Sequence, residues 1–128
     1  MVGWCIIELG KIATNTIRGE YFMQTLRTWK EKSTFSYTGS VKQGTKIVYG
    51  RKPYSRFISA TQYAKLLNHF RGHTVDIGTS RDNRPRGSVG EWLKQSKVTN
   101  IAIASYVGPI LIAEGYAEKA GGSKIRFL

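Results

Sequence analysis

Apolar residues recur with the period of an α-helix in residues 59–71. The apolar residues that share one face, at i, i+3, i+4 and i+7, are Tyr63, Leu66, Leu67 and Phe70. Ser59 followed three residues later by Gln62 has the spacing of a capping box, and Gly72 is a typical helix stop. The pattern predicts a helix over residues 59–71 with this face in the core.

Apolar and polar residues alternate in two other segments. Residues 33–50 predict two short strands joined as a hairpin, with glycines between them. Residues 74–78 predict one further short strand. Between the hairpin and the first helix, residues 51–57 carry several cations and Pro53, and they predict a basic linker without regular structure.

Two more helices are expected in the second half of the chain. Ser88 and Glu91 repeat the capping-box spacing and open a helix over residues 88–97. Residues 100–115 form a third helical segment, which is apolar on nearly all sides. Pro109 predicts a kink in this segment, because proline lacks a backbone N–H and crowds the preceding turn.

A basic hairpin around a glycine pair is predicted for residues 116–128. The order of elements from residue 59 is then helix, strand, helix, turn, helix and hairpin. By element order and spacing, residues 59–128 resemble a winged helix-turn-helix domain. The resemblance implies an α+β fold of three helices, a short strand and a C-terminal β-hairpin. Residues 23–58 lie outside it, as an N-terminal extension with a β-hairpin and the basic linker.

Composition points to a polyanionic partner. The chain has 20 Lys and Arg against 8 Asp and Glu, a net charge of +12, and nucleic acid is the commonest partner of so basic a protein. The single cysteine, Cys5, excludes a disulfide within the chain and a cysteine-based zinc site. The short apolar run near the start suits neither a signal peptide nor a membrane span, so a cytoplasmic protein is expected.

Residues 1–22 are open to two interpretations. Residues 17–23, "IRGEYFM", can be back-translated into a purine-rich ribosome-binding sequence followed by an ATG. Under that hypothesis Met23 is the natural start, the preceding residues are an upstream-translated leader, and the source is a bacterium or a phage. The alternative is a genuine N-terminal strand or helix that contributes to the core.

The resemblance to winged helix-turn-helix domains implies a set of DNA-contacting residues. The start of the third helix would meet base edges through Thr99, Asn100, Ala102, Ile103 and Tyr106. The hairpin would serve as a wing that places Lys119, Lys124 and Arg126 on phosphates, and Lys94 and Lys97 would flank the turn. No Lys or Arg lies between Asn100 and Gly115, so binding mainly to phosphate is expected, because arginine makes the commonest specific base contact. Alternatively, this apolar helix is core or a homodimer surface.

Two further basic segments could add contacts. The predicted loop after the short strand carries Arg81, Arg84 and Arg86, which suit phosphates or a minor groove. The predicted linker interleaves Arg51, Lys52 and Arg56 with Tyr54 and Phe57, a mixture that suits stacking on single-stranded nucleic acid. The alternatives are an ordinary solvated loop and, for Phe57, a place in the core.

Other functions have weaker support in the sequence. His69 and His73 are four residues apart, but Gly72 falls between them, so neither a metal site nor a cofactor is predicted. A small nuclease would need clustered carboxylates, and Asp76, Asp82 and Glu91 match no known spacing. The main alternative to a DNA-binding regulator or accessory factor is a module that docks on an acidic protein surface. Salt-dependent binding to duplex DNA would distinguish the two.

Overall fold

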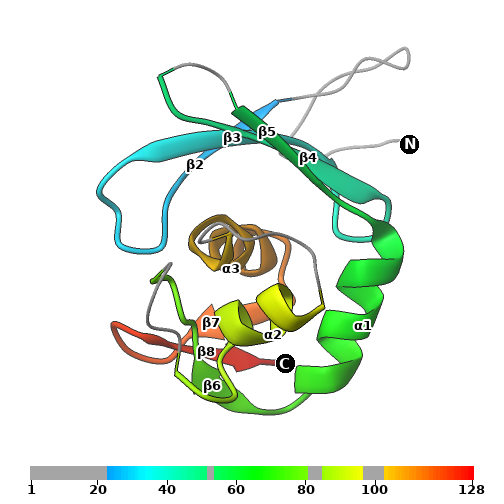
Figure 1. Ribbon diagram of the computed structural model, residues 1–128, viewed down its shortest axis with the longest axis vertical. Coiled ribbons are helices and arrows are strands. Elements are labelled where there is room, and N and C mark those ends of the chain that lie inside the picture. The colour runs from blue at the N-terminus through cyan, green and yellow to red at the C-terminus, as the bar shows by residue number, and fades with distance from the viewer. Residues whose placement is uncertain (1–22, 52–53, 81–84, 97–102) are drawn as a thin grey trace, which may run out of the picture.

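Three helices and two antiparallel sheets make up the fold, which is α+β as expected (Figure 1). The structure is a computed structural model, and it describes residues 23–51, 54–80, 85–96 and 103–128. The strands of the larger sheet are β2 (Gln24–Arg27), β3 (Thr34–Ser40), β4 (Gly44–Tyr49) and β5 (Tyr54–Ile58). The remaining elements are α1 (Ala60–Phe70), β6 (Thr74–Asp76), α2 (Val89–Gln95), α3 (Ala104–Ala113), β7 (Ala117–Lys119) and β8 (Lys124–Phe127).

The larger sheet is a meander in the order β2-β3-β4-β5. The hairpin predicted over residues 33–50 is confirmed as β3 and β4, and β2 extends the sheet at one edge. Tyr37 pairs with Ile47, and both side chains are buried on the face that looks toward the rest of the molecule. Alternation then places the neighbouring side chains of each strand on the opposite face.

The prediction of a basic linker over residues 51–57 is wrong from Tyr54 onward. Residues Tyr54–Ile58 form β5, which pairs with β4 from Tyr49↔Tyr54 to Thr45↔Ile58. Pro53 precedes the strand rather than interrupting it, and proline is tolerated at the start of an edge strand. The larger sheet is therefore four-stranded, with more strand than a simple hairpin extension.

The helices predicted before and after the short strand are confirmed. In α1, Ser59 and Gln62 make both bonds of the capping box, and the predicted apolar face is buried or, at Leu67, partly buried. In α2, the Ser88 side chain accepts a hydrogen bond from the backbone N–H of Glu91. The predicted C-terminal hairpin is also present, and β6 joins it in a sheet of order β6-β8-β7.

The third helix occupies the centre of the molecule. Figure 1 shows α3 between the two sheets, and it contacts β2 of one sheet and β7 of the other. A helix enclosed on several sides needs apolar residues all round, which explains its composition. The described helix begins at Ala104, and its predicted start near residue 100 lies outside the described residues, which omit 97–102.

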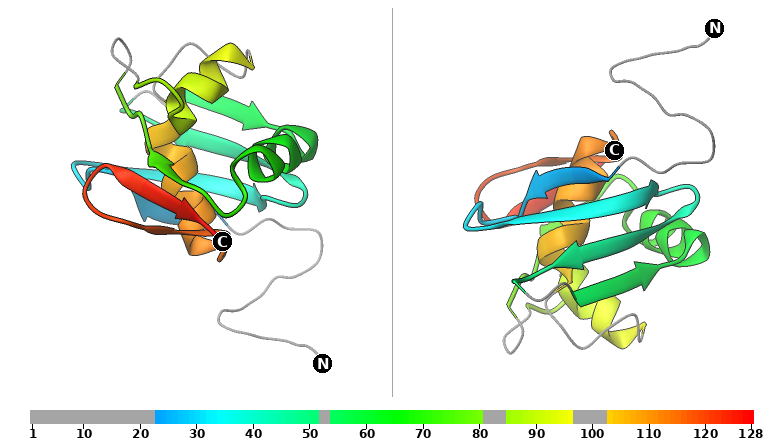
Figure 2. Two further views of the ribbon diagram at one scale, coloured as in Figure 1. Left: turned by 90° about the horizontal axis from the view of Figure 1, so that it is seen from below. Right: turned by 90° about the horizontal axis from the view of Figure 1, so that it is seen from above.

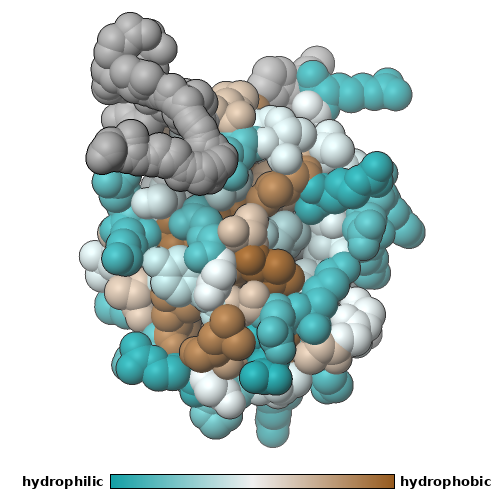
Figure 3. Space-filling model, turned by 180° about the vertical axis from the view of Figure 1, so that it is seen from behind, coloured by the Kyte–Doolittle hydropathy of each residue, from teal (hydrophilic) through white to brown (hydrophobic). Residues whose placement is uncertain are grey.

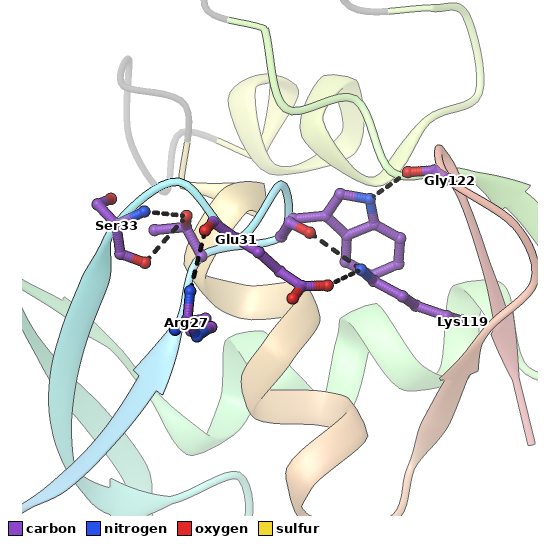
Figure 4. Close-up of polar contacts among 7 residues, drawn as sticks. Arg27, Glu31, Ser33, Lys119 and Gly122 are labelled. Carbon is purple, nitrogen blue, oxygen red and sulfur yellow. Dashed lines mark hydrogen bonds and ion pairs between the residues drawn. The ribbon is translucent and has the colours of Figure 1, made fainter.

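The loop between β2 and β3 fastens the larger sheet to α3 and the hairpin. The buried Trp29 ring lies against Gly108 of α3, where a Cβ would come 2.7 Å from the ring atom Cε3. The Trp29 indole N–H donates to the carbonyl of Gly122 over 2.8 Å, and Lys119 Nζ donates to the Trp29 carbonyl over 3.0 Å (Figure 4). Because these contacts join segments about ninety residues apart, they fix the sheet on the C-terminal half.

Two buried polar contacts tie the helices to the same sheet. The hydroxyls of Tyr63 in α1 and Thr45 in β4 are 2.7 Å apart. Glu114, which caps the C-terminus of α3, accepts hydrogen bonds from the Tyr37 hydroxyl and the backbone N–H of Val41. Burial, together with the neighbouring Glu114 carboxylate, raises the pKa of the Tyr37 hydroxyl far above its usual value. Burial also raises the pKa of Tyr63.

Candidate nucleic-acid interface

Several predicted contact residues fall outside the described part of the chain. They are Lys52, Arg81, Arg84, Lys97, Thr99, Asn100 and Ala102. The predicted base-reading end of the third helix therefore remains a prediction. The other candidates can be placed, and they divide between the hairpin, the helices and the larger sheet.

Each cation of the predicted wing faces a carboxylate. Lys124 Nζ lies 3.2 Å from Asp76, and the guanidinium of Arg126 lies 3.1 Å from Glu118. Lys119 Nζ lies 3.5 Å from the Glu31 carboxylate and also sits over the Trp29 ring. Three cations against three carboxylates leave this side of the molecule with little excess charge. Such exposed pairs are individually weak, but they reduce the local attraction for an anion.

The two described base-reading candidates have structural roles. Ile103 is fully buried at the start of α3. Tyr106 is partly buried, and its ring stacks on Tyr49 with centroids 4.9 Å apart and meets Phe35 edge-on at 5.1 Å. Burial raises the Tyr106 pKa. Since both side chains pack toward the interior, they are poorly placed to contact bases.

Of the other predicted phosphate-binding residues, four are described and exposed. They are Arg51 after β4, Arg56 in β5, Arg86 before α2 and Lys94 near the end of α2. No described carboxylate lies within ion-pair distance of any of them. Arg56 pairs with Ile47 across the sheet, so it lies on the inner side of the edge strand and reaches solvent there.

The far side of the larger sheet carries a group of polar and basic side chains that no sequence motif predicted. We name this side, which faces away from α3, the outer sheet face; Figure 2 shows it in the view from above. By strand register its side chains are Thr25, Arg27, Thr34, Ser36, Thr38, Ser40, Lys46, Val48, Ser55 and Phe57. No described helix or strand covers it. It carries two cations, many hydroxyls and no carboxylate.

An exposed aromatic ring marks one edge of the outer sheet face. Phe57 is 69 % exposed, so the alternative that placed it in the core is wrong. It pairs directly across β4–β5 with Lys46, whose Nζ lies 5.9 Å from the ring centroid. Residues 54–58, "YSRFI", show no strict alternation of apolar and polar residues, and Pro53 with the neighbouring cations led to their interpretation as a linker.

Charge is distributed unevenly over the described residues. Residues 23–51 and 54–58 contain seven Lys and Arg but a single acid, Glu31. Residues 59–80, 85–96 and 103–128 contain seven Lys and Arg against four acids. The larger sheet and its turns therefore carry a net charge of +6 (seven minus one), against +3 (seven minus four) for the rest of the described residues.

Little of the surface of α3 is exposed for the homodimer contact that the sequence predicted. Among residues 104–113 only Ala113 is well exposed, and the partly buried residues are Ser105, Tyr106, Pro109 and Ile112. The face of the molecule opposite to that in Figure 1 does show apolar side chains gathered in its middle, with polar side chains around them (Figure 3). A dimer through α3 would thus involve these few partly exposed residues rather than the buried majority of the helix.

Carboxylates in the described residues have structural partners. Glu91 accepts a hydrogen bond from the backbone N–H of Gly87 over 2.8 Å, and Asp76 pairs with Lys124. Within the described ranges, no three His, Cys, Asp or Glu side chains are grouped closely enough to hold a metal ion. His69 instead packs beside the rings of Phe70 and Trp92.

Comparisons with known proteins leave the site to be argued from this chain alone. Family models, curated proteins and solved structures all give no match. In the part of the chain that the structure describes, each helix is too short or too polar to cross a bilayer.

Proposed function

We propose that the protein binds nucleic acid, and that its excess positive charge on the larger sheet supplies most of the attraction. The proposal rests on the uneven distribution of positive charge over the described residues. Seven cations of the sheet and its turns face one carboxylate, and that carboxylate, Glu31, is already paired with Lys119. A surface of this kind attracts phosphates, because each neutralised phosphate releases condensed counterions.

A winged helix-turn-helix over residues 59–128 is part of the same proposal. The element order α1-β6-α2-α3-β7-β8 and the strand order β6-β8-β7 support it. In such domains the third helix enters the major groove. Here α3 lies between two sheets, so insertion of its body into a groove would require the larger sheet to move away.

Contacts to phosphate rather than base reading follow from this arrangement. Described α3 has no Lys or Arg, Ile103 is buried, and Tyr106 packs on Tyr49. Phosphate contacts position a protein on nucleic acid but do not specify sequence. We therefore propose a binder of low sequence preference, which suits an accessory factor at least as well as a regulator of one operator, and a cytoplasmic, bacterial or phage setting remains our expectation.

Charge-removing variants on the two surfaces test the proposal. Binding of labelled duplex, single-stranded DNA and RNA would be measured by fluorescence anisotropy at several salt concentrations. Arg27→Gln with Lys46→Gln should lower the slope of log affinity against log salt by about 0.7–0.9 for each lost phosphate contact. Lys124→Gln with Arg126→Gln is the matched control on the hairpin and should change the slope less, because both cations are already paired.

Two results would contradict the proposal in different ways. No binding to any probe at low salt would favour an acidic protein as the partner. If only the hairpin variant lowers the salt slope, nucleic-acid binding stands, but the wing is the main contact surface and our assignment to the sheet is wrong.

A further inference from the structure

The outer sheet face combines features that separate it from an ordinary solvated sheet surface. Antiparallel sheets commonly expose one polar face, which usually carries both signs of charge. Here every described side chain on that face is a hydroxyl, a cation, Val48 or Phe57, and the register contains no carboxylate. A surface with donors and cations but no anions is suited to phosphate oxygens.

Phe57 adds a contact that phosphate binding does not need. The Phe57 ring is 69 % exposed and offers apolar area that a ligand could cover. Lys46 lies directly opposite on β4, so a ring and a cation are held side by side by the sheet register. Bases of single-stranded nucleic acid stack on such rings while their phosphates meet neighbouring cations.

The position of Phe57 and Lys46 in the sheet leaves both side chains accessible to a ligand. β5 is an edge strand of the described sheet, and Phe57 lies near its end, one residue before the buried Ile58. Adjacent strands are about 4.8 Å apart, and Phe57 is level with Thr38 of β3 whereas Arg27 is level with Thr34, so a chain crossing diagonally from Phe57 over β4 and β3 to Arg27 on β2 spans about 20 Å. An extended single strand of several nucleotides would cover that span, and Ser36, Thr38 and Ser55 lie near it with hydroxyls that can donate to phosphates.

We infer that the outer sheet face is a binding surface for single-stranded nucleic acid, with Phe57 as the base-stacking residue and Lys46 and Arg27 as phosphate contacts. This inference rests on the proposed function and specifies its substrate form. Duplex is disfavoured as the occupant, because its bases are stacked on one another and offer no free face to the Phe57 ring.

Variants of Phe57 test the stacking contact in the full chain. Affinities for a labelled oligo-dT, an oligo-U of equal length and a mixed duplex would be measured by anisotropy at fixed salt. Phe57→Ala should weaken binding of both single strands by about 5- to 150-fold and leave duplex binding within about twofold. Phe57→Trp should retain or tighten single-strand binding, because the larger ring stacks at least as well.

Tyr54→Ala is the matched control. Tyr54 is 54 % exposed on the same strand, but it lies on the opposite side of the sheet from Phe57 and its ring neighbours Tyr49. The Tyr54→Ala variant should therefore bind single strands with an affinity within about twofold of that of the wild type. A weaker affinity of Tyr54→Ala, with Phe57→Ala unchanged, would overturn the inference and move the stacking contact to the inner side of β5.

The same titrations distinguish a loss of stacking on the outer sheet face from a complete lack of nucleic-acid binding. If wild type binds the three probes in a salt-dependent way and Phe57→Ala binds them equally well, stacking on the outer sheet face is excluded while nucleic-acid binding stands. If wild type binds no probe, both proposals fall. Thermal unfolding of each variant confirms that the exposed substitutions leave the fold intact, as their position at the surface predicts.

Discussion

The backbone N–H of Trp29 donates a hydrogen bond to the carbonyl of Ser105 over 2.9 Å. In an uninterrupted α-helix this carbonyl would accept from residue 109, but Pro109 has no N–H to give. The loop between β2 and β3 thus satisfies the acceptor that proline leaves unpaired in the middle of α3. As a result α3 continues through Pro109 to Ala113, and the larger sheet is joined to it at that point.

Adding a methyl group at Gly108 should weaken this junction. A Cβ there would lie 2.7 Å from Cε3 of Trp29 and 3.0 Å from Cδ1 of Ile77. Gly108→Ala should therefore destabilise the protein by about 1–3 kcal/mol, although alanine favours a helix over glycine. Urea denaturation would measure the loss. In a Trp29→Ala background the penalty should shrink or change sign, and an undiminished penalty would mean that Trp29 is not the obstacle.

Alkaline pH should destabilise the fold through its buried tyrosines. The pKa values of Tyr37 and Tyr63 are raised in the folded state by burial, so above pH 10 the unfolded chain loses these protons first. Their contribution is complete below the ordinary tyrosine pKa and is lost as pH rises toward the folded-state values. The free energy of unfolding should fall by at most about 1.4 kcal/mol per pH unit for each group.

Denaturation at a series of alkaline pH values would check this slope. Tyr37→Phe should flatten it, whereas Tyr54→Phe, which alters an exposed ring, should leave it unchanged. Equal slopes in wild type and Tyr37→Phe would show that the Tyr37 hydroxyl ionises as readily in the folded protein as in the unfolded chain.

Truncation of Leu66 should be much more damaging than truncation of its neighbour. Leu66 in α1 is 1 % exposed, whereas Leu67 is only partly buried. Leu66→Ala should cost about 2–5 kcal/mol of unfolding free energy, the usual range for a buried leucine, and Leu67→Ala distinctly less. Chemical denaturation of both variants gives the comparison. A reversed order would mean that the face of α1 is rotated from the one described.

A chain that begins at Met23 should fold and bind nucleic acid as well as the full chain. The described core cluster runs from Trp29 to Phe127 and contains no residue before Trp29. Thermal unfolding and the anisotropy titration used above would compare the two chains. An insoluble or molten product would show that residues 1–22 supply part of the core, as a genuine N-terminal element would.

Local sequence determined much of the secondary structure. The capping box at Ser59, the period of α1 and the hairpin around Gly121 were predicted correctly, because caps, periodicity and turn residues act over a few residues. The prediction went wrong at residues 54–57, where Pro53 and the cations suggested a linker. Whether that segment becomes a strand depends on β4 offering it an unpaired edge, which no local pattern reveals.

Tertiary structure alone decided where the apolar helix lies and which cations are paired. Composition showed that residues 100–115 are apolar on nearly all sides, but only the packing of α3 between two sheets explains it. Likewise, the +12 charge is in the sequence, but its location is not. Lys119 meets Glu31, and Lys124 meets Asp76, across 88 and 48 residues of chain. Charge pairing at such separations depends on the long-range fold. Because the hairpin cations are paired with carboxylates, most of the unpaired positive charge of the described residues lies on the larger sheet.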